Sequence, residues 1–446
     1  METRIETFSY PNGDIQRVQL VQPDSWETLD FLRLSYEEPA LEGFYKIYKQ
    51  FLVPGCPWLF GNMVMFRLPA DLETELNFTS GKFGALHDPV TAAAAILRRG
   101  VKIVFGKPVF LTAAAKQLWR ELEKKNCLYQ VSGKLPVTTV IPVGNLAGFL
   151  SHREQEAAMK VNASFFIMDR FDCATVYDRI GTPLGLLVKN GVVENPPLFD
   201  REALLVKKDG SVSITAPSVQ DLEIRIGGYS FCHGKNATVF SRPDRNQTAA
   251  KGKKLVIIGT KVEAVHCCKN IPIPASGFVL CVDKNVAVKP GDSVTYGGME
   301  DVAFGIQVGN SLVRNGVKTD GFISRFYNIR KFERVPFPPS LYPMDYSGAR
   351  AARIALGADA NGKPMILWAE GAAKLGYVKG QHSCGASLTE LAEICAKLGM
   401  VNGVNLDGGG SAQILLHNQR SLQISDRKAE DFSESERAIP LALIVR

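Results

Sequence analysis

The chain has 446 residues, which is long for one domain and suggests two or three folded units. With 46% apolar residues and no uninterrupted apolar stretch of about 18 residues or more, the composition favours globular domains and argues against a membrane-spanning helix. The formal charge of +7 is modest and the basic residues are dispersed, so the sequence shows no nucleic-acid-binding module.

Cysteine and histidine usage gives neither a disulfide nor a zinc pattern. The nine cysteines are scattered without a Cys-x-x-Cys pair, and the six histidines are not spaced as helical metal ligands. Residues 1–6 contain acids and no apolar segment of a secretory signal. These features predict reduced thiols and a cytoplasmic location, and a secreted protein without its signal peptide would share them.

The N-terminal third has the pattern of a mixed α/β region. A short helix is expected over Val90–Arg99 and a strand over Val101–Phe105. Thr112 is placed to cap a second helix, in which Trp119 belongs to an apolar face and is expected in the core. The role of this region is not readable from its residues, so residues 1–150 are predicted to be an accessory region.

Strand signals dominate from about residue 155 onward. Short apolar segments alternate with Asn-Gly, Asp-Gly, Pro-Gly and Gly-Gly turns. The predicted fold class is α+β, with a large mixed or antiparallel sheet and few helices in addition to the N-terminal mixed α/β region. The expected strands include Leu184–Lys189, Ala203–Val206, Leu255–Ile258, Phe278–Val282 and Ser311–Val313.

Residues 387–399 carry the clearest helix signature. Ser387 and Glu390 are spaced as a capping box, in which each side chain bonds the backbone N–H of the other. Apolar residues then repeat at helical spacing, and Gly399 supplies a C-terminal cap. A strand from Val401 to Leu406 is expected next. Glu390 thus has a structural explanation, and a catalytic role for it is the less favoured alternative.

The segment Asn405–Ser411, with the sequence NLDGGGS, is the most informative in the chain. In one interpretation Asp407 supplies a carboxylate, while Gly408, Gly409 and Gly410 let backbone N–H groups converge on an anion. In the other, Asp407-Gly408 simply turns a hairpin between two buried strands. A plain hairpin needs one or two glycines, so the third favours the functional interpretation slightly.

Several ordered blocks of the chain resemble the phosphodiester glycosidase family, and NLDGGGS is the most specific of them. The blocks place the resemblance over about residues 155–446, so residues 151–446 are predicted to form a phosphodiester glycosidase-like catalytic domain. The other blocks are Asn162–Phe166, Gly181–Gly191, Arg353–Gly357, Ile366–Gly371, the helix from Ser387, and Glu436-Arg437 before a final strand Ile439–Val445.

The resemblance implies a hydrolase that removes an N-acetylglucosamine-like sugar from a sugar-1-phosphodiester in a glycan or cell-envelope component. Such a site must bind the negative phosphate, for which the planar fork of arginine is suited. It must also stabilise a positively charged sugar centre and manage protons, which is the usual work of carboxylates. No cofactor is required for this chemistry, and a divalent metal is compatible with it.

The residues of the matching blocks are assigned to these tasks. Asp407 is the first choice for the essential carboxylate and Glu370 the second, although their separation is needed to assign nucleophile, acid or base. Arg353 and Arg437 are expected to bind phosphate, with structural ion pairs as the alternative. The further substrate-binding candidates are Asn162, whose alternative is a turn amide that satisfies the backbone, and Asn405, Gly408, Gly409, Gly410 and Ser411.

The sequence departs from the family pattern at two places. Ala163 and Ser164 stand where glycines are expected, and Glu370 stands where aspartate is expected. His382 lies in a predicted loop and has the solution pKa of an acid or base, but an incidental role is favoured for it.

Two other functions remain open from the residues. One is a metal-assisted phosphodiesterase that cleaves the P–O bond, with Asp407 and Glu370 as oxygen ligands for Mg²⁺ or Ca²⁺. The other is a non-catalytic carbohydrate-binding protein of the same fold, for which the departures from the family pattern are the only sign. The sugar, the aglycone and the oligomeric state are not readable from the sequence.

Overall fold

The structure is a computed structural model. It describes residues 1–34, 64–66, 96–97, 100–104, 107–124, 128–130, 148–151, 156–167, 175, 177–178, 181–198, 201–242, 245, 247–267, 270–320, 350–371, 377–427 and 433–446. Among these residues, no helix is long and apolar enough to cross a membrane.

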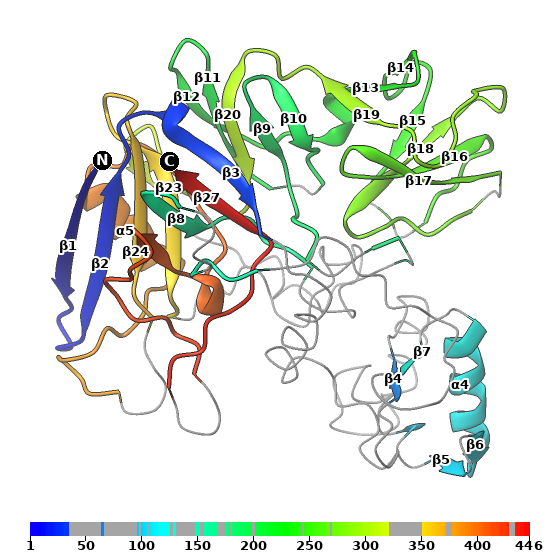
Figure 1. The fold of residues 1–446 in the computed structure, drawn as a ribbon, viewed down its shortest axis with the longest axis horizontal. Helices are drawn as coiled ribbons and strands as arrows, with labels where there is room; N and C mark the ends of the chain where they lie inside the picture. The colour runs from blue at the N-terminus through cyan, green and yellow to red at the C-terminus, as the bar shows by residue number, and fades with distance from the viewer. Residues whose placement is uncertain are drawn as a thin grey trace.

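The N-terminal region contains a short helix and two small strand pairs (Figure 1). The helix α4 (Ala113–Lys124) begins as expected after Thr112, whose side chain accepts from the N–H of Ala115. Trp119 is buried against the edge of Phe110. The strand pairs are β4 (Val64–Phe66) with β7 (Leu128–Gln130) and β5 (Val101–Val104) with β6 (Lys107–Phe110); most of the expected helix Val90–Arg99 lies outside the described residues.

A seven-stranded antiparallel sheet forms the centre of the C-terminal region. Its strands come from both ends of the sequence, which explains why local patterns predict strands but not which of them are neighbours in the sheet. In spatial order they are β1 (Glu2–Ser9), β2 (Ile15–Gln22), β24 (Pro364–Ala369), β23 (Arg353–Ala358), β25 (Asn402–Asn405), β21 (Ser311–Arg314) and β22 (Val317–Lys318).

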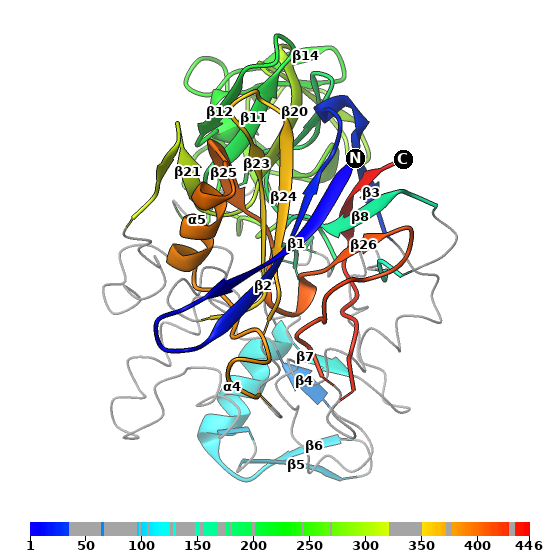
Figure 2. The same cartoon turned by 90° about the vertical axis from the view of Figure 1, so that its left-hand side faces the viewer.

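Both faces of this sheet are covered, so the residues of its central strands β23 and β24 are buried throughout rather than alternately. The predicted helix, α5 (Leu388–Lys397), lies along β25 and β21 and covers one face with its apolar side (Figure 2). Its capping box is present, and Gly399 has the positive φ of a C-terminal cap. The other face belongs to the large core that continues into the neighbouring sheets.

A second sheet lies beside the first and combines residues that are distant in sequence. Its order is β26 (Ile414–Leu416), β8 (Met159–Asn162), β27 (Leu441–Val445) and β3 (Leu29–Arg33). β1 pairs with β2, and β2 and β3 pair with strands of the C-terminal half. Residues 1–34 therefore belong to these sheets, although they precede the boundary predicted near residue 150.

Three further antiparallel sheets complete the described C-terminal region and confirm the remaining expected strands with small shifts at their ends. They are β10 (Val192–Asn195), β9 (Leu187–Lys189), β20 (Val302–Gln307), β11 (Ala203–Lys207) and β12 (Val212–Thr215); β14 (Tyr229–Phe231), β13 (Glu223–Ile226) and β19 (Val294–Gly297); and β15 (Thr238–Phe240), β18 (Gly277–Val282), β16 (Lys253–Ile258) and β17 (Lys261–His266). The strands described are thus paired antiparallel, and few helices accompany them, as the α+β class requires.

One edge of the seven-stranded sheet collects the predicted site residues. The end of β24, the start of β23 and the end of β25 lie together because these neighbouring strands are antiparallel. Arg353 therefore pairs with Ala369, next to Glu370, while the N–H of Leu406, next to Asp407, donates to Ile354.

Candidate active site

The loop after β25 connects two different sheets. It leaves the seven-stranded sheet at Asn405 and enters the second sheet at Ile414. The interpretation of Asp407-Gly408 as a hairpin turn between paired strands is therefore wrong. The loop contains one 3-10 turn, and its residue Gly409 has a φ of +60°, a conformation that glycine adopts without strain.

Much of the loop backbone is bonded within the protein. The N–H of Asp407 donates to the carbonyl of Ala163 (3.1 Å) and that of Gly409 to the carbonyl of Ala352 (2.8 Å). Two more N–H groups, at residues 411 and 412, close turns inside the loop. These four N–H groups are therefore bonded within the protein, whereas the N–H groups of Gly408 and Gly410, which belong to the predicted anion-binding nest, are not among them.

Asn162 links the two ends of the loop. Its side-chain Nδ2 donates to the carbonyl of Asp407 (2.6 Å), and its Oδ1 accepts from the N–H of Gln413 (3.0 Å). The Asn162 side chain is buried. Its amide bonds backbone groups of the loop that have no partner in a neighbouring strand. Its observed contacts are those of the structural alternative, and they fix the backbone on both sides of the glycines.

The carboxyl group of Asp407 has an environment suited to proton transfer. Burial raises its pKa to about 6, outweighing the hydroxyl of Ser411, the guanidinium of Arg437 and the Gly408 N–H, which lower it. The carboxylate of Asp426 nearby raises the pKa further. The residue as a whole is only partly buried. A carboxyl group with this pKa gains and loses protons near neutral pH, as a general acid or base requires.

Arg353 and Arg437 lie against opposite parts of the glycine loop. Cδ of Arg353 is 3.6 Å from the position that a Cβ on Gly408 would take, and Nη2 of Arg437 is 2.3 Å from the corresponding position on Gly410. Nε of Arg353 donates to the carbonyl of Ala386 (3.0 Å). Arg437 lies close enough to the Asp407 carboxyl group to lower its pKa, and a guanidinium group is suited to bind an anion.

Asp426 is a residue of this site that the sequence patterns do not indicate. Its Oδ2 accepts from both Nε (3.0 Å) and Nη2 (2.8 Å) of Arg437. It lies in an irregular segment, where no periodicity marks a side chain as buried or paired. The sequence could have indicated Asp426 only through a search for an acidic residue that pairs with the predicted Arg437.

Glu370 is buried, and both oxygens of its carboxylate accept hydrogen bonds. Its Oε2 accepts from Nε of Arg17 (2.7 Å) and from the hydroxyl of Ser383, while its Oε1 accepts from the N–H of Gln423 (2.9 Å). These contacts join three chain segments next to the site. They favour a role in placing those segments over a direct role in catalysis.

Several buried polar atoms near the loop have no hydrogen-bond partner within the described part of the protein. Such atoms are rare in folded proteins, and water or ligand groups usually satisfy them. Their presence supports the assignment of this region as a binding site. They are Oδ1 of Asn405, both side-chain polar atoms of Gln413, Oγ of Ser164 and Nδ2 of Asn310.

Part of the chain matches a known protein family. The sequence of residues 269–446 matches the phosphodiester glycosidase family. These residues belong to that family. The matched part of the phosphodiester glycosidase domain includes Asp407, Glu370, Arg353 and Arg437, whereas the blocks around Asn162 and Gly181 lie outside it. The bonds from Asn162 to the loop show how the upstream part is joined to the matched domain.

Solved structures similar to this chain share little sequence with it. A hypothetical protein from Synechocystis is 20% identical, with a TM-score of 0.37, over 69% of this chain and 55% of that chain. A putative exported protein from Burkholderia pseudomallei is 14% identical, with a TM-score of 0.41, over 100% and 96%. The zebrafish N-acetylglucosamine-1-phosphodiester alpha-N-acetylglucosaminidase catalytic domain, auto-inhibited by its pro-peptide, is 12% identical, with a TM-score of 0.36, over 100% and 82%. No curated protein matches the sequence.

The phosphodiester glycosidase domain shows no ready-made metal centre in the part of the chain that is described. No group of three or more His, Cys, Asp or Glu side chains is arranged to hold a metal ion there. His382 has a local structural contact, because its Nδ1 accepts from the N–H of Val378 (2.8 Å).

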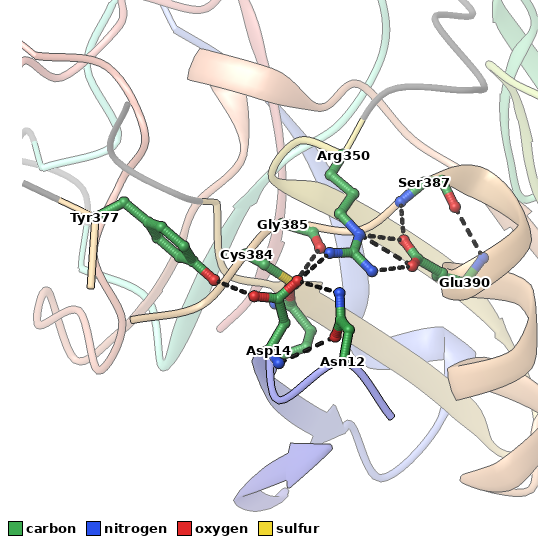
Figure 3. Close-up of polar contacts among 9 residues, drawn as sticks. Asn12, Asp14, Arg350, Tyr377, Cys384, Gly385, Ser387 and Glu390 are labelled. Carbon is green, nitrogen blue, oxygen red and sulfur yellow. Dashed lines mark hydrogen bonds and ion pairs between the residues drawn. The ribbon is translucent and has the colours of Figure 1, made fainter. Parts of the chain in front are cut away.

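Arg350 joins the start of β23 to two other elements of the domain (Figure 3). Its guanidinium pairs with Asp14 before β2 (2.8 Å) and with Glu390 in the first turn of α5 (2.7 Å). Tyr377 also donates to Asp14 (2.7 Å). Burial opposes ionisation of Glu390, but hydrogen bonds from Arg350 and from the Ser387 N–H lower its pKa. Glu390 therefore has the structural role that the capping box predicts.

Proposed function

We propose that the chain is a hydrolase that removes a sugar, N-acetylglucosamine-like in size and polarity, from a sugar-1-phosphodiester of a glycan or cell-envelope component. The observation that carries the proposal is Asp407, with a pKa of about 6, on a glycine loop flanked by Arg353 and Arg437. The family match over residues 269–446 supports the same reaction class.

The chemistry assigns separate tasks to the two kinds of side chain. The bond between the sugar C1 and the bridging oxygen breaks, water supplies the new oxygen at C1, and a phosphomonoester leaves. The arginines bind the phosphate oxygens and stabilise the charge that grows on the leaving group. Asp407 exchanges a proton or stabilises the positive sugar centre, the two tasks that carboxylates perform in glycoside hydrolysis.

The test is turnover of N-acetylglucosamine 1-(methyl phosphate) by the parent and by Asp407→Asn. We expect the variant to lose about 10² to 10⁴ in kcat, the contribution typical of a proton-transfer group. The matched control is Asp301→Asn, because Asp301 is an exposed aspartate paired with Lys207 far from the loop in sequence. Turnover by Asp407→Asn at the parent's rate would remove Asp407 from the reaction.

A further inference from the structure

Asp426 fixes the orientation of Arg437. One oxygen, Oδ2, accepts from two N–H groups on the same side of the guanidinium, at 3.0 and 2.8 Å. Two bonds to one planar group determine both its position and the direction in which the remaining N–H groups point. The pair is largely removed from solvent, since the side chains of Arg437 and Asp426 are 11% and 25% exposed.

Gly410 provides the space for this pair. A Cβ atom on Gly410 would lie 2.0 Å from Oδ2 of Asp426 and 2.3 Å from Nη2 of Arg437, far inside contact distance. No other residue fits there without displacing the ion pair. The third glycine of the NLDGGGS segment therefore has a reason other than turning the chain.

The segment that carries Asp426 is itself held in place. The N–H of Gln423 donates to Glu370 (2.9 Å), and the N–H of Ser435 donates to the carbonyl of Asp426 (3.0 Å). Glu370 is in turn paired with Arg17 of β2. A continuous set of contacts thus runs from the central sheet through Glu370 to the segment of Asp426 and on to Arg437.

We propose that Asp426 is a positioning residue that holds Arg437 in the orientation in which it binds the substrate phosphate, with Gly410 as the required space. The inference rests on the anion-binding part of the proposed function. A long arginine side chain loses conformational freedom when it binds an anion. A side chain that is already held in place loses less, so it binds the anion more tightly. Because Asp426 is negatively charged, its electrostatic effect alone would weaken phosphate binding, so positioning and charge give opposite expectations.

The experiment is calorimetric titration of the full chain with inorganic phosphate. We expect Asp426→Ala to weaken phosphate binding roughly three- to tenfold, the cost of ordering one long side chain. Asp426→Asn keeps an oxygen that can accept from Arg437. We therefore expect this variant to bind phosphate more tightly than Asp426→Ala does. Gly410→Ala should weaken binding as Asp426→Ala does, and Asp301→Ala should match the parent.

A double variant separates positioning from an independent effect. We compare the phosphate affinity of the double variant Arg437→Gln/Asp426→Ala with that of Arg437→Gln alone. If Asp426 acts only through Arg437, the double variant binds phosphate no more weakly than the single variant. Tighter binding by both Asp426 variants, additive losses in the double variant, or no phosphate binding by the parent would each overturn the proposal. Thermal melting verifies folding, and Asp426→Asn, which preserves size, decides the matter if Asp426→Ala does not fold.

The titration involves no turnover, so its failure is distinct from failure of the proposed function. A parent that binds phosphate through Arg437 but hydrolyses no phosphodiester leaves the positioning role intact. If the parent hydrolyses the phosphodiester and substitution of Asp426 leaves the phosphate affinity unchanged, only the positioning role is refuted.

Discussion

At the scale of one residue, burial of the Asp407 carboxyl group makes the stability of the folded protein depend on pH. Burial raises its pKa to about 6, so the ionised form is less stable in the folded protein than in the unfolded chain, where the ordinary value near 3.8 applies. The folded protein binds the proton more tightly between these two values. Its stability therefore falls as pH rises from about 4 to about 6, and the full cost is present above that range.

We expect Asp407→Asn to stabilise the protein at pH 7.5 and not at pH 4. The difference in unfolding free energy at pH 7.5 is at most about 3 kcal/mol, because each unit of pKa shift corresponds to roughly 1.4 kcal/mol and lost bonds reduce the gain. Urea unfolding at both pH values measures it. The control Asp301→Asn should show no such gain, since its pairing with Lys207 lowers the pKa of Asp301. An equal difference at both pH values would contradict the burial of the Asp407 charge.

At the scale of elements, local patterns predicted what local interactions determine. The capping box and the apolar spacing gave α5, and turn residues bounded β11, β16, β18 and β21. The junction after Asp407 was not predictable in the same way, because whether β25 and β26 share a sheet depends on partners far away in sequence. Asn162 and Asp426 illustrate this: each contacts the glycine loop from a segment that no local pattern connects to it.

A substitution at Glu370 tests whether this residue takes part in catalysis or holds neighbouring chain segments in place. We expect Glu370→Gln to lower the unfolding free energy by about 1.5–3 kcal/mol, the range for hydrogen bonds to a charged group, because Arg17 and the Gln423 N–H lose an ionised acceptor. The folded variant should retain kcat within about tenfold of the parent, well below the loss typical of an acid or base. Denaturant unfolding and turnover on the same preparation measure both quantities.

The pattern for Glu370→Gln is the reverse of that for Asp407→Asn, which should gain stability and lose turnover. A Glu370→Gln variant with unchanged stability and a loss of kcat of about 10² or more would instead make Glu370 the second catalytic carboxylate.

At the scale of the molecule, the site exists where two sheets meet. Residues 1–34 contribute β1, β2 and β3 to these sheets, so the first and last parts of the described chain fold together. The family resemblance indicated the candidate site residues, and its blocks begin near residue 155, so they do not include these N-terminal strands. Strand pairing over such sequence distances leaves no local signal in the chain.

The central claim is cleavage of the sugar C–O bond at the Asp407 loop, and the most direct test is hydrolysis of N-acetylglucosamine 1-(methyl phosphate) in ¹⁸O-labelled water. The label must be read in the methyl phosphate by mass, because the anomeric oxygen of the free sugar exchanges with water while phosphate oxygens do not. We expect unlabelled methyl phosphate, at the same rate with and without EDTA, because the two arginines supply the positive charge. Labelled methyl phosphate, with activity lost in EDTA and restored by Mg²⁺ or Ca²⁺, would contradict the account and establish metal-assisted cleavage of the P–O bond.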